Sequence, residues 1–348
     1  MGLSRTRRVY HSPGSFGGGR CGLTLIELVV TLAIIGILIL LALPAIQRAR
    51  AASMRLSCAN HLRQIGIALQ RYHDDFDLYP SAMPVTAQMD VNVAGGGFIY
   101  SPFVRLLPYL EQSALYNSIN FVGGLFQEPF ALTLNNTVVA TRVGSYLCPA
   151  DGASRIRRFG PCSYRINVGA RCIGRSHPDV GAFEPWLWLS ARDFSDGTSH
   201  TAGVSEKTIG QLDDSRFHAG SQWQYPVTAP FPQSRLLPDE ARRICASANP
   251  NSHKVRDDGG ATWFRNGFVH TWYNHVAEPN APFLDCALHA PFQFDLVTIG
   301  VFGPRSYHPS GVNVMMMDGS VRSVSERVGI DIWRSVATRS GGETVPSF

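Results

Sequence analysis

The sequence predicts an α+β protein in which one long N-terminal helix carries a mostly antiparallel β-sheet domain. Three observations lead to this prediction. The apolar run from Leu23 to Leu43 would be about 31 Å long as a helix, enough to cross a bilayer core. Apolar residues then recur every three or four positions to about residue 76, which continues the helix. Asp-Gly pairs at 196–197 and 318–319 lie beside short apolar runs, as is typical of turns that feed antiparallel strands.

The apolar run contains a single charged residue, Glu27. A carboxylate near the start of a membrane helix is costly unless it meets a positive partner, so such a residue is functional by default. Cleavage of the chain after Gly22 would create an α-amino group on Leu23, one helical turn from Glu27. That amino group could neutralise the carboxylate in the same chain or in a neighbouring chain.

Gly22 followed by Leu-Thr-Leu-Ile-Glu and an apolar run resembles the class III signal of type IV prepilins and type II secretion pseudopilins. The resemblance implies a pilin-like fold, cleavage after Gly22, methylation of Leu23 as the new terminus, and a docking role for Glu27. It implies three kinds of partner: a prepilin peptidase/methyltransferase, other pilin or pseudopilin subunits, and inner-membrane lipid. The sequence departs from the usual motif at Leu23, where phenylalanine is common, and at Cys21, where a basic residue is common.

Three other interpretations of this stretch are weaker. A secretory signal would be removed after the apolar run, where Ala49-Arg50-Ala51 is a poor cleavage site. An uncleaved signal anchor has no need of Glu27, and a lipoprotein at Cys21 lacks the preceding apolar region. Arginines flank the run on both sides, so an inside N-terminus, with one membrane pass and a periplasmic or filament-borne C-terminal domain, follows from the resemblance alone.

We therefore expect four segments: a basic leader, a transmembrane helix, its amphipathic continuation, and an exported globular domain. One continuous helix is expected through Pro44, and two helices broken at that proline are the alternative. The expected boundaries are residues 1–22, 23–44, 45–76 and 77–348, with a C-terminal hairpin at 312–324.

Charge and cysteine content narrow the classes of function. The formal net charge is +5, and residues 1–22 hold four arginines and no acidic residue, so their removal leaves +1. With no basic run in the remainder, nucleic-acid binding is not indicated.

The cysteines beyond the leader are even in number, which suggests disulfides in an exported domain, with buried free thiols as the alternative. No Cys-x-x-Cys pair predicts a structural zinc. These cysteines are Cys58, Cys148, Cys162, Cys172, Cys245 and Cys286.

A second resemblance lies near the C-terminus. His308 is followed by nine residues and then Asp318-Gly319, with Asn313 between them. The spacing resembles a box found in a particular group of prepilin-like proteins, and similar segments recur up to Glu343. A metal or acid–base pair is one interpretation of His308 and Asp318. Because a strand length separates them, structural roles are preferred for His308, Asn313, Asp318 and Gly319.

The same Asp-Gly pair predicts a hairpin. We expect a two-residue type I′ loop, which needs positive φ at both central residues. In that register Met316 faces Val321, and Val314, Met316 and Val321 share the core face.

Candidate catalytic and ion-binding residues are few. Ser199, His200 and Asp196 are neighbours in one expected turn instead of groups converging from separate elements, so no triad is predicted. Glu111, expected within a short helix between Leu106 and Ile119, has no partner in view.

The pairs Asp213-Asp214 and Asp257-Asp258 lack the alternating ligands of a calcium loop and are interpreted as solvated turns. We predict no catalytic residue, no cofactor and no metal.

The sequence thus predicts a structural subunit of a type II secretion or type IV pilus-like assembly, not an enzyme. The alternative is a membrane-tethered envelope module that binds a glycan or other ligand through the aromatic-rich residues 183–300. An exported hydrolase would need a convergent site, which the sequence does not provide.

Overall fold

The computed structural model describes residues 24–83, 100–121, 134–152, 159–172, 180–211, 222–224, 237–247, 254–289 and 299–343. Gly22, Leu23 and the Asp213-Asp214 pair lie outside these residues. The chain divides into two units, residues 1–50 and 51–348, and each is described by itself.

The first unit is the apolar half of helix α1, whose full extent is Leu25–Phe76. Large apolar side chains are exposed all round this half, with Leu40 73% exposed. Pro44 lies inside the helix, which continues through it, so the alternative of two separate helices is wrong. α1 is long and apolar enough to cross a membrane, and it is the one such helix in the described residues.

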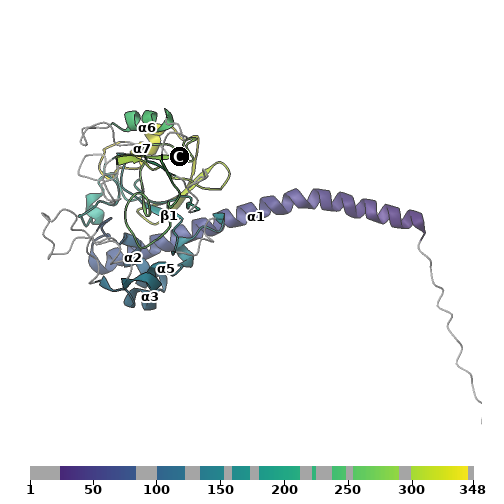
Figure 1. The fold of residues 1–348 in the computed structure, drawn as a ribbon, viewed down its shortest axis with the longest axis horizontal. Helices are drawn as coiled ribbons and strands as arrows, with labels where there is room; N and C mark the ends of the chain where they lie inside the picture. The colour runs from purple at the N-terminus through teal and green to yellow at the C-terminus, as the bar shows by residue number, and fades with distance from the viewer. Residues whose placement is uncertain are drawn as a thin grey trace, which may run out of the picture. The chain divides into compact units, whose positions relative to one another are not determined.

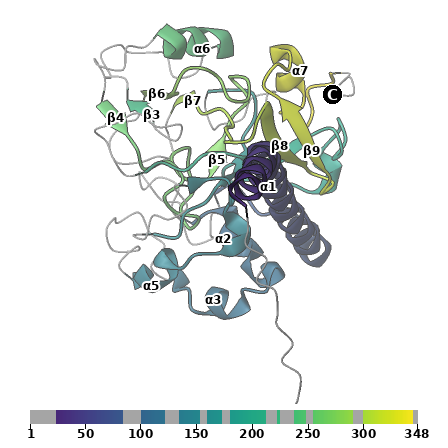
Figure 2. The same ribbon diagram turned by 90° about the vertical axis from the view of Figure 1, so that its right-hand side faces the viewer.

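The second half of α1 belongs to the globular unit and buries a single stripe. The buried positions recur every three or four residues, as expected for an amphipathic helix. The helix backbone lies close to the C-terminal hairpin at Gly66, where an added Cβ would lie 3.0 Å from both Gly319 Cα and Met315 Sδ. Gln70 Nε2 also donates to the carbonyl of Met317. Figure 2 shows β8 and β9 beside this helix. The buried residues are Cys58, Leu62, Ile65, Gly66, Ala68, Leu69 and Tyr72.

A five-stranded sheet forms the centre of the globular unit, in the order β5-β1-β2-β8-β9. Three of its pairings are antiparallel and the β1–β5 pairing is parallel. The predicted α+β class with a mostly antiparallel sheet is therefore confirmed. The strands are β1 (Tyr164–Asn167), β2 (Ala202–Glu206), β5 (Trp272–Tyr273), β8 (Gly311–Met316) and β9 (Val321–Ser325).

Both faces of this sheet are covered. Ile166, Met315 and Met317 pack with the buried stripe of α1 in one core. On the other face Val314 and Met316 pack with Trp333 of α7 (Ile330–Ser335). Because the sheet is buried on both sides, every residue of β8 is buried.

A second, four-stranded sheet has the order β4-β3-β6-β7, with β3 and β6 parallel. Helix α6 (Pro238–Ser247; labelled in Figure 1) contacts β6 and β7, and the Cys245–Cys286 disulfide joins it to β6. No periodic pattern of apolar residues predicts this sheet, because its strands are short. They are β3 (Gln222–Gln224), β4 (Lys254–Arg256), β6 (Asp285–His289) and β7 (Ile299–Val301).

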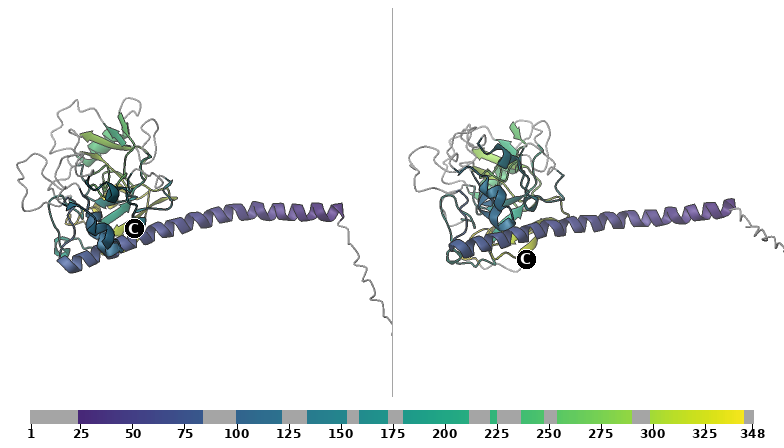
Figure 3. Two further views of the ribbon diagram at one scale, coloured as in Figure 1. Left: turned by 60° about the horizontal axis from the view of Figure 1, so that its bottom comes forward. Right: turned by 90° about the horizontal axis from the view of Figure 1, so that it is seen from below.

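Short helices lie near the end of α1 (Figure 3). Tyr109 Oη donates to Asp75 Oδ2 at 2.6 Å, which ties this group to the last turns of α1. The expected helix around Glu111 is wrong: Glu111 has φ 60° and separates two short helices. The pieces are α2 (Pro102–Leu106), η1 (Leu107–Leu110), α3 (Ser113–Asn117), α5 (Asn136–Ala140), η3 (Gly144–Tyr146) and, further along the chain, η5 (Ala191–Asp193).

The C-terminal hairpin exists, but its predicted register is wrong by one residue. Met315 pairs with Val321, and Gly319 N donates to Met316 O at 2.9 Å. Only Gly319 of the Asp-Gly pair has positive φ, at 85°. The loop therefore has three residues, consistent with a type I turn followed by a left-handed glycine. Val321 packs with Met315 on the α1 side, not with Val314 and Met316.

Strand β2 forms after the predicted Asp196-Gly197 turn, but its simple alternation is broken. The register against β8 shifts between Ala202 and Val204, as in a β-bulge. Ala202 consequently packs with Val314, Met316 and Trp333 on the α7 side of the sheet, which we call the α7-side core. Val204 packs with Met315 and the buried stripe of α1 on the other side, which we call the α1-side core.

The α7-side core contains a neutral histidine, which predicts an acid-sensitive term in stability. His275 stacks on Trp333 at 3.7 Å; its Nδ1 faces the Trp333 carbonyl at 2.7 Å and its Nε2 the Tyr273 hydroxyl at 3.0 Å. Burial lowers the pKa of His275 from 6.5 to about 3. The unfolded chain therefore binds a proton that the folded chain excludes between these values, and stability falls as pH drops from 6.5 towards 3.

We expect His275→Phe to lower stability at neutral pH but to flatten its pH dependence between pH 6.5 and 5. One proton corresponds to a slope of up to about 1.4 kcal/mol per pH unit. Urea unfolding across this range measures the slope, and His200→Phe, at an exposed histidine, is the control. Equal slopes in the wild type and His275→Phe would contradict the assignment.

Candidate functional site

The predicted site residues lie in two places, at the start of α1 and around His308. At the start of α1, Thr24 N donates to Glu27 Oε2 at 2.8 Å, and the Thr24 hydroxyl donates to the same oxygen at 2.9 Å. Glu27 N lies 3.4 Å from Thr24 Oγ1. This reciprocal arrangement is a capping box, with Thr24 as N-cap and Glu27 three residues later.

The capping box holds the carboxylate of Glu27 against the backbone N–H of Thr24, the N-cap residue of the helix. Gly22 and Leu23 lie outside the described residues, so their geometry is not part of the site. Thr24 directly follows Leu23 in the chain. A new α-amino group on Leu23 would therefore start one residue from a backbone N–H that already binds Glu27.

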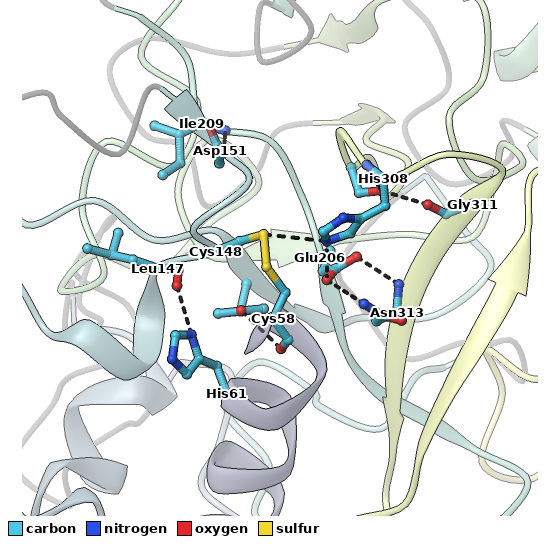
Figure 4. Close-up of a disulfide and its surroundings, with 12 residues drawn as sticks. Cys58, His61, Leu147, Cys148, Asp151, Glu206, Ile209, His308, Gly311 and Asn313 are labelled. Atoms are coloured by element: carbon cyan, nitrogen blue, oxygen red, sulfur yellow. Dashed lines mark hydrogen bonds and ion pairs between the residues drawn. A yellow bond between two sulfur atoms is a disulfide. The ribbon is translucent and has the colours of Figure 1, made fainter. Parts of the chain in front are cut away.

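The second group centres on Glu206, which is buried at the end of β2. Its Oε2 accepts from Asn313 N and its Oε1 from Asn313 Nδ2, both at 2.8 Å. His308 Nε2 lies 3.3 Å from Glu206 Oε1 (Figure 4). One buried carboxylate thus connects β2, β8 and the loop that precedes β8.

A disulfide borders the same carboxylate. Cys58 of α1 is bonded to Cys148, and Cys148 Sγ lies 3.6 Å from His308 Nε2. Two further contacts hold the disulfide's segments: His61 Nδ1 meets Leu147 O at 2.8 Å, and Tyr164 Oη donates to Cys58 O at 3.1 Å. In the described part of the chain, Cys58, Cys148, Glu206 and His308 are the one set of His, Cys, Asp and Glu residues grouped closely enough to hold a metal.

The structure separates the two ends of the predicted His-x9-Asp-Gly box. His308 precedes β8, and Asp318 follows it in the hairpin loop. Asp318 Oδ1 accepts from Ser320 N at 2.9 Å, as a turn residue does. Asn313 and His308 both contact the carboxylate of Glu206, so the structure places these two residues of the box together. Asp318 and Gly319 lie apart from them in the hairpin loop.

The residues weighed for catalysis do not converge. Ser199 Oγ and His200 Nδ1 are 3.1 Å apart, but the carboxylate of Asp196 accepts from the backbone N–H groups of Gly341 and Gly342. Of the two aspartate pairs interpreted as solvated turns, Asp257-Asp258 is described by the structure. Asp257 is fully buried, and its carboxylate accepts a hydrogen bond from Gln211 N at 2.9 Å. Its interpretation as a solvated turn is therefore wrong for Asp257.

A buried charge cluster lies close in sequence to Glu206. Lys207 Nζ contacts Asp285 Oδ2, and Arg305 Nε lies 3.4 Å from Asp285 Oδ1. Burial lowers the pKa of Lys207 to about 7, with the nearby guanidinium of Arg165 contributing, while Asp285 opposes the shift. The cluster joins the end of β2 to the start of β6, and so links the two sheets.

Both predicted states of the cysteines, disulfides and buried free thiols, occur in the structure. Two pairs are disulfides, Cys58–Cys148 and Cys245–Cys286. Cys162 and Cys172 are free and buried, and burial raises the pKa of each thiol to about 12.

The apolar helix and the sheet domain together define a pilin-like α+β protein, with α1 as the one helix in the described residues that is suited to anchor it in a membrane. The chain belongs to the family described as "Protein of unknown function (DUF1559)", which matches residues 47–331. The prokaryotic N-terminal methylation motif matches residues 18–43. Neither the curated proteins nor the solved structures provide a match.

Sequence reasoning missed two features of these sites. The capping box was detectable, because Thr24-Leu-Ile-Glu27 before an apolar run is its signature. The meeting of Glu206 with His308 and Cys148 had no local signal, because these residues come from segments far apart in the chain.

The hydrogen bonds of Glu206 predict the effect of its removal. Glu206→Ala leaves Asn313 N and Nδ2 without their acceptor in a buried setting, and each such donor costs about 1–3 kcal/mol. We expect the free energy of unfolding in urea to fall by roughly 2–5 kcal/mol. Glu326→Ala, at an exposed glutamate, is the control and should change it little. A similar small loss in both variants would show that the carboxylate of Glu206 is not required.

Proposed function

We propose that this protein is a non-catalytic structural subunit of a type II secretion or type IV pilus-like assembly. A prepilin peptidase cleaves it after Gly22 and methylates Leu23, and Glu27 then guides docking with other pilin or pseudopilin subunits. The single observation that carries the proposal is the N-terminal methylation motif over residues 18–43. The motif overlaps the start of α1, which in the described part of the chain is the one helix long and apolar enough to span a membrane.

The geometry of Glu27 supports this role. Its carboxylate is bound at the helix N-terminus by Thr24. Negative charge at that position is favourable because of the helix dipole, and Thr24, whose backbone N–H binds the carboxylate, is the residue that follows Leu23 in the chain. In a bilayer core an unpaired carboxylate is expensive, which favours an amino group as its partner, from the same chain or from the next subunit.

The proposed location follows from the same features. The processed chain remains in the inner membrane by a single pass, with its N-terminus inside and its globular unit in the periplasm or in an envelope filament. Disulfides suit an exported, oxidising location, and the globular unit contains two.

Intact mass and N-terminal sequencing of the protein from its own membranes test processing. We expect a chain that starts at Leu23 with the added mass of one methyl group on its α-amino nitrogen. A chain that starts at Met1, or near Ala52, would overturn the proposal.

A second candidate function is a tethered envelope module that captures a ligand. An open cavity of about 530 Å³ favours it, lined by charged groups that include Arg242, Glu278, Glu326 and Arg327. The Arg242 guanidinium and the Glu278 carboxylate form two hydrogen bonds there, at 3.0 and 2.7 Å. Among the residues that the structure describes, no aromatic side chain lines this cavity, so it does not match the predicted aromatic glycan surface.

Charge reversal at Glu27 separates assembly from tethering. We expect Glu27→Arg to reduce incorporation into assemblies at least tenfold, because it places a cation beside the helix N-terminus and the new α-amino group. Incorporation is measured by cross-linking to neighbouring subunits, using chain whose mass shows normal processing. Glu111→Arg, a charge reversal at an exposed glutamate of the globular unit, is the control. Undiminished incorporation of Glu27→Arg would favour a tethered module.

A further inference from the structure

Four potential metal ligands converge beneath the five-stranded sheet, each from a different segment. Cys58 comes from α1, Cys148 from the segment after η3, Glu206 from the end of β2, and His308 from the loop before β8. Their ligand atoms all lie within 4.8 Å of one another (Figure 4). Two thiolates, an imidazole and a carboxylate form a donor set suited to tetrahedral Zn²⁺.

The distances already match part of a tetrahedral site. With metal–ligand bonds of about 2.0–2.3 Å, neighbouring ligand atoms lie roughly 3.3–3.8 Å apart. His308 Nε2 is 3.3 Å from Glu206 Oε1 and 3.6 Å from Cys148 Sγ. The two sulfur atoms are closer because they are bonded to each other. Separation of the two sulfurs is therefore the main change that metal binding requires.

The surroundings of the four side chains favour an ion coordinated by the protein over one exposed to solvent. The exposed fractions of Cys58, Cys148, Glu206 and His308 are 0, 5, 1 and 5%. Asn313 binds both oxygens of the Glu206 carboxylate, which fixes its orientation in the way that outer-shell hydrogen bonds fix metal ligands. A disulfide alone requires neither a histidine nor a carboxylate beside it.

The second disulfide provides an internal comparison. Cys245 and Cys286 join α6 to β6 and are also buried. Among the described residues they belong to no group of three or more potential ligands. The histidine and carboxylate are therefore specific to the Cys58–Cys148 pair.

We propose that Cys58, Cys148, Glu206 and His308 bind Zn²⁺ when the two cysteines are thiols, so that a metal holds these four segments in place of the disulfide. Binding breaks two S–H bonds, forms two Zn–S bonds and releases two protons. A newly made chain holds both thiols and needs no reductant. Later oxidation removes two electrons from the thiolates, which pass to a disulfide-exchange oxidant, forms the Cys58–Cys148 bond and frees the ion. This inference is independent of the proposed function.

Cobalt(II) is the probe for the test, because its visible spectrum reports tetrahedral thiolate coordination. The full chain, in detergent and in a Cys21→Ser background, is reduced with a phosphine and titrated with Co²⁺ and then Zn²⁺. We expect one Co²⁺ per chain, with thiolate charge-transfer bands, displaced by Zn²⁺. The oxidised chain should bind at least tenfold more weakly.

Variants locate the site. Cys58→Ser/Cys148→Ser should abolish the signal, and His308→Ala should weaken binding at least tenfold. The matched control, Cys245→Ser/Cys286→Ser, should keep it. Circular dichroism checks that each variant is folded. Absence of a tetrahedral signal in the reduced chain, or its persistence without Cys58 and Cys148, would overturn the proposal.

A measurement on the chain without these substitutions covers the case in which variants fail to fold. Zn²⁺ should slow alkylation of Cys58 and Cys148, read by peptide mass spectrometry, and a disulfide oxidant should release the ion as the Cys58–Cys148 cross-link forms. Equal alkylation with and without Zn²⁺ would exclude the site.

Discussion

The buried carboxylate of Glu206 is the constraint on which the centre of the domain depends. A carboxylate removed from water must be hydrogen-bonded, and Asn313 supplies two donors to it. These bonds fix the end of β2 against β8, beyond the bulge that shifts their register at Ala202 and Val204. The imidazole of His308 reaches the same carboxylate, which places the preceding loop. One side chain thus bonds the end of β2 to β8 and contacts the histidine that lies beside the disulfide.

Helix α1 meets that centre through a stripe of small and apolar side chains. Gly66 allows the helix backbone to approach the hairpin, because any larger residue would meet Gly319 and Met315. A hairpin loop with positive φ at Gly319 alone brings its backbone against the helix. The three-residue loop, the register of β8 with β9 and the choice of glycine in the helix are therefore parts of one packing arrangement.

The parts of this fold that local chemistry specifies were predictable. The apolar run, the amphipathic continuation and the turn before β2 each have a strong periodic or turn signal. The three-residue loop of the C-terminal hairpin was not, because Asp-Gly suits both a two-residue type I′ turn and the end of a three-residue loop. The second sheet was missed because strands such as β7 (Ile299–Val301) are too short to show a period. Cysteine pairing and the position of Glu206 are set by contacts between distant segments, which no local pattern encodes.

The position of the Cys58–Cys148 link has a mechanical consequence. Along α1, the exposed apolar residues come first, and Cys58 is the first buried residue of the helix. A force applied through the membrane-spanning half enters the domain along the helix backbone and meets Cys58 before any other buried contact. A disulfide or a bound metal at Cys58 passes the load to the sheet through Cys148 and its neighbours. The buried residues that follow Cys58 along the helix are then not pulled away from the sheet one side chain at a time.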